Sequence, residues 1–158
     1  MKYKINLFTA LTLGISFLSS QVYASEFDQY LQQQQIIDSK FKIKKIAELN
    51  EMLAVLSAED SKTLPLQIDH NTIIEQLKLT ANKTQLKGLI ITPDFAQFEK
   101  DLGPKEVTQL IRKNLLQNCG IFFEHRYQLE NPYKVMLELS STTRSYDVEI
   151  SQKDCKGN

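Results

Sequence analysis

The sequence predicts an α+β domain in which N-terminal helices are followed by a hairpin, a helix and a second hairpin. The two hairpins are expected to form an antiparallel sheet covered by the helices. Apolar residues recur at helical spacing between positions 26 and 58, whereas apolar and polar residues alternate over 72–92 and 135–150. A further helical pattern lies between the alternating segments. Hairpins connected by a helix are typical of the α+β layout.

The first 24 residues have the three parts of a cleavable Sec-type signal peptide. Lys2 and Lys4 supply positive charge, residues 5–18 are uncharged and mostly apolar, and a small-x-small site ends at Ala24, leaving Ser25 as the first mature residue. The alternative, a transmembrane anchor, needs about 20 apolar residues. A serine rather than a cysteine at position 25 disfavours a lipid-modified N-terminus.

Cleavage after Ala24 leaves 134 of the 158 residues, the size of one domain with a sizeable core. We expect residues 25–60 to form a helical segment that packs on the core and residues 61–158 to form the α+β core. The cleaved chain has 17 basic and 19 acidic residues, which excludes the basic excess of a nucleic-acid-binding protein. No second apolar span follows, so the sequence predicts a soluble periplasmic or secreted protein without a stable membrane anchor.

The two cysteines, Cys119 and Cys155, both lie in the predicted mature chain. Two thiols in an oxidising compartment, with none left over, most simply form one disulfide. A redox pair or a metal site is disfavoured, because CxxC spacing is lacking and no further cysteine is present to complete a tetrahedral site.

Two helices are predicted before the sheet. The first runs from Glu26 to Gln35, and the second, at about residues 41–58, has an apolar stripe made of Ile46, Leu49, Leu53 and Leu56. Two heptads are too few to argue for a coiled-coil dimer through residues 41–58, so we expect this stripe to pack on the core of a monomer.

A basic cluster lies near the start of the second predicted helix, where positive charge opposes the helix dipole. It consists of Lys40, Lys42, Lys44 and Lys45. A site for anionic lipid or peptidoglycan is one interpretation. A solvated face on which Lys44 pairs with Glu48 is the favoured one.

The alternating segments predict two hairpins. After a polar hinge at 58–63 and an extended Leu64-Pro65-Leu66, strands at about 72–79 and 86–92 are joined by a turn at 81–84. The alternation groups Ile73, Glu75, Leu77 and Leu79 on one face of the first hairpin. In the second hairpin, which turns at 140–144, the inward-facing residues are Val135, Leu137, Leu139, Tyr146, Val148 and Ile150.

Between the hairpins, Gly103-Pro104 opens the clearest helix of the chain, because proline fits the first turn. Its apolar face consists of Val107, Leu110, Ile111 and Leu115, extended by Leu116 and Cys119. We expect Gly120 to end the helix as a left-handed cap. Residues 121–129 fit either a continued helix or a strand.

The sequence contains no catalytic signature, and no catalytic residue, cofactor or metal is predicted. A zinc site built from Asp69, His70, Glu124 and His125 lacks the usual ligand spacing. No serine has a GxSxG context, and the scattered carboxylates show no pairing that sequence alone could reveal. A periplasmic hydrolase with a site built from such carboxylates and His70 or His125 remains the alternative function.

An aromatic cluster precedes the last hairpin. It contains Phe122, Phe123, Tyr127 and Tyr133. The functional interpretation is an anchor for a partner protein. The structural interpretation, packing over the sheet in a domain without tryptophan, is favoured.

The order of these features resembles that of small exported bacterial proteins of the quorum-sensing-regulated virulence factor-like type. The shared features are the Leu64-Pro65, Ile68-Asp69 and Thr72 run, a helix ending in Cys119, and Asp154-Cys155 near the C-terminus. The resemblance implies a non-enzymatic exported domain and carries over no catalytic residue. The predicted function is therefore binding of a protein or envelope component, as an effector, a virulence-associated protein or an immunity or inhibitor protein.

Overall fold

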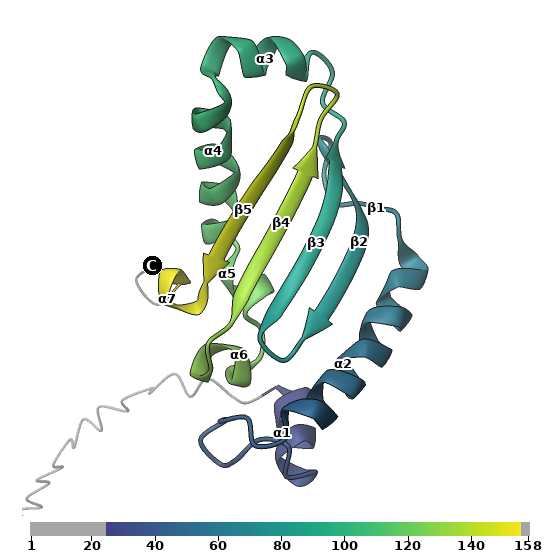
Figure 1. The fold of residues 1–158 in the computed structure, drawn as a ribbon, viewed down its shortest axis with the longest axis vertical. Helices are drawn as coiled ribbons and strands as arrows, with labels where there is room; N and C mark the ends of the chain where they lie inside the picture. Colours follow the sequence, from purple (N-terminus) through teal and green to yellow (C-terminus); the bar gives the residue numbers. More distant parts are fainter. Residues whose placement is uncertain (1–24, 156–158) are drawn as a thin grey trace, which may run out of the picture.

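The computed structural model describes residues 25–155, so the predicted signal peptide lies outside the described residues. These residues form a five-stranded sheet with helices against it (Figure 1). The strands are β1 (Leu66–Gln67), β2 (Thr72–Thr80), β3 (Lys83–Ile90), β4 (Lys134–Ser140) and β5 (Ser145–Ser151). The helices are α1 (Glu26–Gln33), α2 (Ile46–Asp60), the 3-10 turn η1 (Ser61–Thr63), α3 (Phe95–Leu102), α4 (Pro104–Gln117), α5 (Cys119–Phe122), α6 (Arg126–Glu130) and α7 (Gln152–Cys155). The α+β class is confirmed.

The sheet has the order β1-β2-β3-β4-β5 and is mixed, so the prediction of a wholly antiparallel sheet was wrong. Both hairpins are antiparallel as expected, but β3 and β4 pair in parallel. The reason is the long connection from Ile90 to Lys134, which contains α3 to α6 and returns the chain to the end of the sheet where β3 began. A crossover of this length is what a parallel pair requires.

The two faces of the sheet differ in polarity. The predicted alternation of the second hairpin is confirmed: Val135, Leu137 and Leu139 are buried and stand opposite Ile150, Val148 and Tyr146. The other face carries cross-strand ion pairs, with Lys87 to Glu138 and Lys134 to Glu149 both at 2.7 Å. The helices therefore cover one face, and the charged face is left to solvent.

A β-bulge changes which residues of β2 face the core. The pairing steps from Ile74 opposite Gly88 to Gln76 opposite Lys87, so Glu75 is the extra residue. Because of the extra residue, Ile74 is buried and lies on the same face of the sheet as Leu77. The prediction placed Ile73, not Ile74, on the face of Leu77, and this part of it was wrong. A side chain at Gly88 would place its Cβ 2.3 Å from the carbonyl oxygen of Ile73, so the bulge requires glycine there.

Helix α2 begins at Ile46, five residues later than predicted, because residues 34–45 form a loop. The loop turns at Phe41, whose φ is 61°, and the backbone nitrogens of Lys44 and Lys45 donate to the carbonyl of Ile36. The basic cluster thus precedes the helix. Lys44 pairs with Asp38 at 3.2 Å instead of Glu48, and Lys45 takes Glu48.

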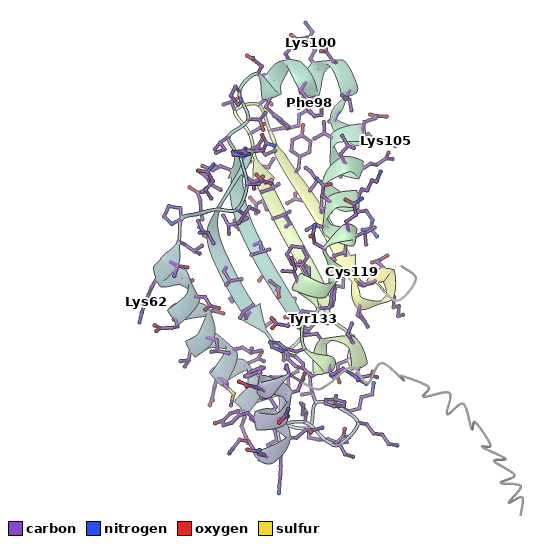
Figure 2. All side chains as sticks on the ribbon, turned by 180° about the vertical axis from the view of Figure 1, so that it is seen from behind. Lys62, Phe98, Lys100, Lys105, Cys119 and Tyr133 are labelled. Atoms are coloured by element: carbon purple, nitrogen blue, oxygen red, sulfur yellow. A yellow bond between two sulfur atoms is a disulfide. The ribbon has the colours of Figure 1, made fainter. Side chains whose placement is uncertain are left out.

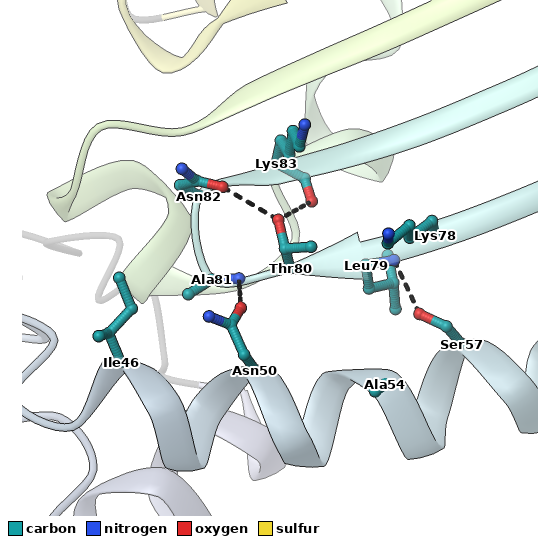
Figure 3. A pocket seen from close by; sticks show the side chains of 10 residues that line it. All are labelled: Ile46, Asn50, Ala54, Ser57, Lys78, Leu79, Thr80, Ala81, Asn82 and Lys83. Atoms are coloured by element: carbon teal, nitrogen blue, oxygen red, sulfur yellow. Dashed lines mark hydrogen bonds between the residues drawn. The ribbon is translucent and has the colours of Figure 1, made fainter.

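Two hydrogen bonds fasten α2 to the end of β2 (Figure 3). The hydroxyl of Ser57 accepts from the backbone nitrogen of Leu79 at 2.7 Å, and Asn50 Oδ1 accepts from that of Ala81 at 2.8 Å. The pocket between α2 and this end of β2 is lined by the residues that make these two hydrogen bonds, so its polar groups serve to hold the fold together. Leu49 and Leu53 of the predicted stripe are buried, whereas Ile46 is 57% and Leu56 37% exposed, so only the middle of the stripe packs on the core as predicted.

The connection between the hairpins is more helical than predicted. Helix α3 was not expected, and α4 begins at Pro104 as predicted. Gly120 is not a left-handed cap: α4 ends at Gln117, and Gly120 lies inside α5. In the ambiguous stretch 121–129, residues 121–122 belong to α5 and residues 126–129 to α6, and the three residues between them form a non-helical connection, so no strand forms there.

The predicted disulfide is confirmed: Cys119 at the start of α5 is bonded to Cys155 at the end of α7. A formed disulfide is typical of proteins that fold in an oxidising compartment. Among residues 25–155, no helix has the length and apolar character needed to cross a bilayer.

Candidate functional site: an apolar groove

A groove of about 1000 Å³ lies between α4 and the segment around β1, and we call it the apolar groove. Its floor is the inner face of the sheet. The floor residues are Ile74, Leu77, Leu86, Leu137 and Leu139, one wall is Val107, Leu110, Ile111 and Leu115 of α4, and the other is Leu64, Leu66 and Ile68. Phe95 and Phe98 lie at the α3 end, and Ile121 and Phe122 at the α5 end.

The groove exists because the helices cover only the two sides of the sheet. Helix α4 packs against β5, and α2 packs against β2. Figure 2 shows both helices on the near side of the sheet, with the middle strands visible between them. The inward-facing residues of β4 are nevertheless covered, because Leu137 is 8% and Leu139 5% exposed, so side chains of the flanking elements reach over this part of the floor.

The walls expose large apolar side chains along the groove. Ile121 is 73% exposed, Ile68 55% and Leu66 49%, and Leu110 and Phe98 are each more than 40% exposed. Single exposed apolar residues are ordinary, but a contiguous apolar strip on a monomer marks a binding surface. The groove is therefore the strongest candidate site on the described part of the chain.

A buried carboxylate holds α3 against the β4–β5 turn and so fixes one end of the groove. Glu99 is only 5% exposed; its Oε2 accepts from the hydroxyl of Thr143, and its Oε1 pairs with Arg144. The Thr143 hydrogen bond, opposed by desolvation, holds the pKa of Glu99 below its usual value. Burial, with Glu99 nearby, raises the pKa of Tyr146 to about 12.

The disulfide holds the other end of the groove. It ties α5, which carries Ile121 and Phe122, to α7 at the end of β5. The same corner is held by Arg112 of α4, which pairs with Asp154 at 2.9 Å. Asp154 also accepts from the backbone nitrogen of Ser151 at 2.7 Å, and this hydrogen bond lowers its pKa.

Polar residues line the rim unevenly. Asp60 and Asp69 lie on the side of α2 and β1, and Asn114 and Asn118 lie on the α4 side. The ion pairs found among residues 25–155 include neither aspartate. One wall of the groove is therefore acidic and the other is neutral.

The structure separates the four aromatic residues predicted as a partner anchor. Phe123, Tyr127 and Tyr133 are at most 4% exposed and belong to the core, where Tyr133 shares a hydrogen bond of 2.9 Å with Thr84. Burial raises the pKa of Tyr127 far above its usual value. Phe122 is half-buried and lines the groove. A partner-binding role for the four stays a prediction, and Phe122 is the member placed where a partner could touch it.

The residues considered for chemistry do not converge. His70 is exposed in the loop between β1 and β2, while the Nδ1 of His125 lies 2.8 Å from the hydroxyl of Ser25 before α6. No cluster of three or more His, Cys, Asp or Glu side chains able to hold a metal ion occurs within residues 25–155. The zinc alternative built on Asp69, His70, Glu124 and His125 thus has no site in this part of the chain.

Sequence reasoning missed most of the groove. Leu110 was expected to lie on the buried face of its helix, and Leu64-Pro65-Leu66 was expected only to form an extended entry to the sheet. No structural role was predicted for Ile68. The available signal was the apolar Leu64, Leu66 and Ile68 series in a segment too short to be a buried strand. Whether these three side chains are exposed depends on where α4 lies, and no local sequence pattern specifies that position.

These features define a small, disulfide-linked α+β protein with an open apolar groove on one sheet face. No protein family model and no curated protein matches the chain. Solved structures with a similar fold include a candidate secreted protein of Pseudomonas aeruginosa, 16% identical with a TM-score of 0.48, which aligns over 70% of this chain and 95% of its own. Another is the pilotin EpsS of the Vibrio vulnificus type 2 secretion system, 12% identical with a TM-score of 0.48, aligned over 70% of this chain and 94% of its own.

Likeness at this level concerns the path of the backbone and carries no statement about activity or partners. The resemblance to the quorum-sensing-regulated virulence factor-like type stays a prediction.

Proposed function

We propose that this protein is an exported binding protein that holds an amphipathic helix of a partner protein in the apolar groove. The observation that carries the proposal is the strip of exposed apolar side chains between α4 and β1. Helix-in-groove binding uses this arrangement, in which an apolar helix face covers an apolar trough. Of the partner classes expected from the sequence, a protein fits better than an envelope polysaccharide, because the floor and walls offer apolar contact.

A helix fits the groove better than an added strand. The outer edge of the sheet here is β1, which has only two residues and follows Pro65, a residue without a backbone N–H. Few hydrogen bonds are available to a strand at that edge. Helix α4 has 14 residues, or about 21 Å at 1.5 Å per residue, so a partner helix of about four turns could lie alongside it.

The rim predicts the charge of the partner helix. Asp60 and Asp69 lie on the same side of the groove and belong to no ion pair among the described residues. A lysine or arginine bordering the apolar face of the partner helix would complement them. Charge at the rim contributes more to orientation and association rate than to affinity.

A fluorescent 14-residue peptide with a leucine stripe and flanking lysines tests the proposal, with a scrambled peptide of the same composition as reference. Leu110→Glu and Leu66→Glu each place a charge in the groove, and we expect binding measured by anisotropy to weaken at least about tenfold. Val55→Glu is the matched control, since Val55 is a 69% exposed helical residue outside the groove.

Equal binding of the scrambled peptide, or full binding by both groove variants, contradicts the proposal. A fluorescent fatty acid that binds the groove while the helical peptide does not would assign the groove to lipid instead. The hydrolase alternative has less support, because His70 and His125 lie outside the residues that line the groove.

A further inference from the structure

Ser25, the first residue that the structure describes, contacts a buried carboxylate. Asp28 lies in the first turn of α1 and is 0% exposed. Its Oδ2 accepts from the hydroxyl of Ser25 at 2.8 Å and from the Ser25 main-chain nitrogen at 3.3 Å. The nitrogen that follows the predicted cleavage site is therefore within hydrogen-bonding distance of a buried acid.

The same carboxylate joins the N-terminal helix to α6. Asp28 Oδ2 accepts from the backbone nitrogen of Arg126 at 2.7 Å, and Oδ1 accepts from that of Tyr127 at 3.1 Å. The hydroxyl of Ser25 donates to Asp28, so His125 Nδ1, 2.8 Å from that hydroxyl, is left as the donor of their contact. Asp28 thus links α1 to α6, beside the core contact that Leu31 of α1 makes.

The charge of Asp28 is incompletely balanced by these contacts. The backbone N–H groups and the serine hydroxyl that donate to it are neutral. The ion pairs formed among residues 25–155 leave Asp28 out. A buried carboxylate without a cationic partner is costly, because hydrogen bonds replace only part of its lost hydration.

We propose that Asp28 is the receptor for the α-ammonium group created at Ser25 when the signal peptide is removed. The proposal rests on the predicted cleavage after Ala24 and is independent of the apolar groove. A signal peptidase hydrolyses the peptide bond: the carbonyl carbon of Ala24 takes the water oxygen and becomes a carboxylate. The Ser25 nitrogen keeps its electron pair, gains protons and becomes an ammonium group, which is the main form of an α-amine near pH 7.

Processing would therefore change the contact without moving the chain. Before cleavage, the Ser25 nitrogen is an amide with one N–H. After cleavage it is a cation with three donors beside the same Oδ2, and the neutral hydrogen bond becomes a charge-assisted one. Removal of the signal peptide then strengthens the junction between α1 and α6, so the processed chain is the more stable one.

A double-mutant cycle, in which the folding equilibrium constants of exported variants are compared, tests the proposal. The full chain is expressed with residues 1–24 in place, and mass spectrometry identifies the N-terminus of the purified product. The parent is compared with a variant in which one alanine is inserted between Ala24 and Ser25, so that the new ammonium lies one residue away. Both N-termini are combined with Asp28→Asn, and with Glu26→Gln as the matched control, because Glu26 is an exposed neighbour of equal charge.

We expect the insertion to lower the folding equilibrium constant at least about tenfold when Asp28 is present, as hydrogen bonds between charged groups exceed neutral ones by this order. In Asp28→Asn the insertion should have little effect, whereas in Glu26→Gln its full effect should persist. Equal effects of the insertion with and without Asp28 would overturn the proposal, as would an exported protein that does not begin at Ser25.

If Asp28→Asn does not fold, the parent protein itself decides the question. The pKa of the Ser25 α-amine, measured from the pH dependence of its acylation, should lie above about 8, the ordinary value. His125 and Arg126 border the same site, and both are unchanged in every protein compared. An α-amine pKa at or below about 8 would overturn the pairing with Asp28.

Discussion

Replacing both cysteines by serine should destabilise the protein through its unfolded state. Cys119 and Cys155 are 36 residues apart in sequence. For a loop of that length the chain-entropy model gives about 4 kcal/mol of stabilisation at 25 °C. A domain of this size shifts its Tm by about 3–4 °C per kcal/mol, so Cys119→Ser/Cys155→Ser should melt roughly 12–16 °C lower than the parent.

The folded state of the double variant should stay close to that of the parent. Both cysteines are only half-buried, so serine leaves no large cavity. The C-terminal corner is also held by Asp154, which accepts from Ser151 and pairs with Arg112. Because these contacts remain, most of the lost stability should come from a less constrained unfolded chain, and the urea m-value should rise with the area exposed on unfolding.

Urea unfolding followed by circular dichroism at 222 nm measures this difference, since the chain has no tryptophan to report by fluorescence. Reduced parent protein is the control, because it lacks the bridge but retains both sulfur atoms. The reduced parent and the double variant should unfold at similar urea concentrations. A loss below about 1 kcal/mol, or one seen in the double variant alone, would refute the loop-entropy reasoning.

Three further changes probe the scaffold around the groove. Gly88→Ala should cost about 1–3 kcal/mol of unfolding free energy, because its Cβ would lie 2.3 Å from the Ile73 oxygen. Gly120→Ala is the control and should cost nothing, since no atom lies within 4 Å of its new Cβ. Equal losses in urea titrations of the two variants would contradict the bulge argument. Ser57→Ala removes the acceptor of a strand N–H and should cost about 1–3 kcal/mol in the same assay. The lowered pKa of Glu99 means that the folded state binds its proton less tightly, so stability from this group is present above pH 4.5 and is lost as pH falls through the folded pKa. Glu99→Gln should therefore lose less stability than the parent between pH 7 and pH 3 in thermal melts, and identical acid slopes would refute that role.

Most elements followed from local patterns, but their arrangement did not. The alternation of Val135, Leu137 and Leu139 and the proline at the start of α4 specify a strand and a helix with nearby residues alone. The parallel pairing of β3 with β4 depends on the path of residues 91–133, which no local pattern contains. The bulge at Glu75 likewise reverses a two-residue alternation that looked regular in sequence.

The candidate site was less predictable than the fold for a related reason. A helix with a broad apolar face, such as α4, predicts burial of that face, and Leu110 was assigned to it. Whether an apolar residue is covered depends on the spacing between packed elements, here between α4 and β1. The four aromatic residues were grouped because they lie within one short stretch of sequence, yet Tyr127 and Tyr133 fill the core.

The α4 wall of the groove is held in place by contacts that involve no occupant. The elements on either side of α4 are fixed by contacts outside the groove: α3, which precedes α4, by the Glu99 ion pair with Arg144, and α5, which follows it, by the disulfide. Arg112 of α4 itself pairs with Asp154. Because both ends are held to β4 and β5, closing α4 onto the middle strands would break these contacts. A partner helix would therefore meet the α4 wall already in place, and binding would not have to offset the ordering of that wall. The backbone around the groove should accordingly move little on binding, as in other preorganised complexes.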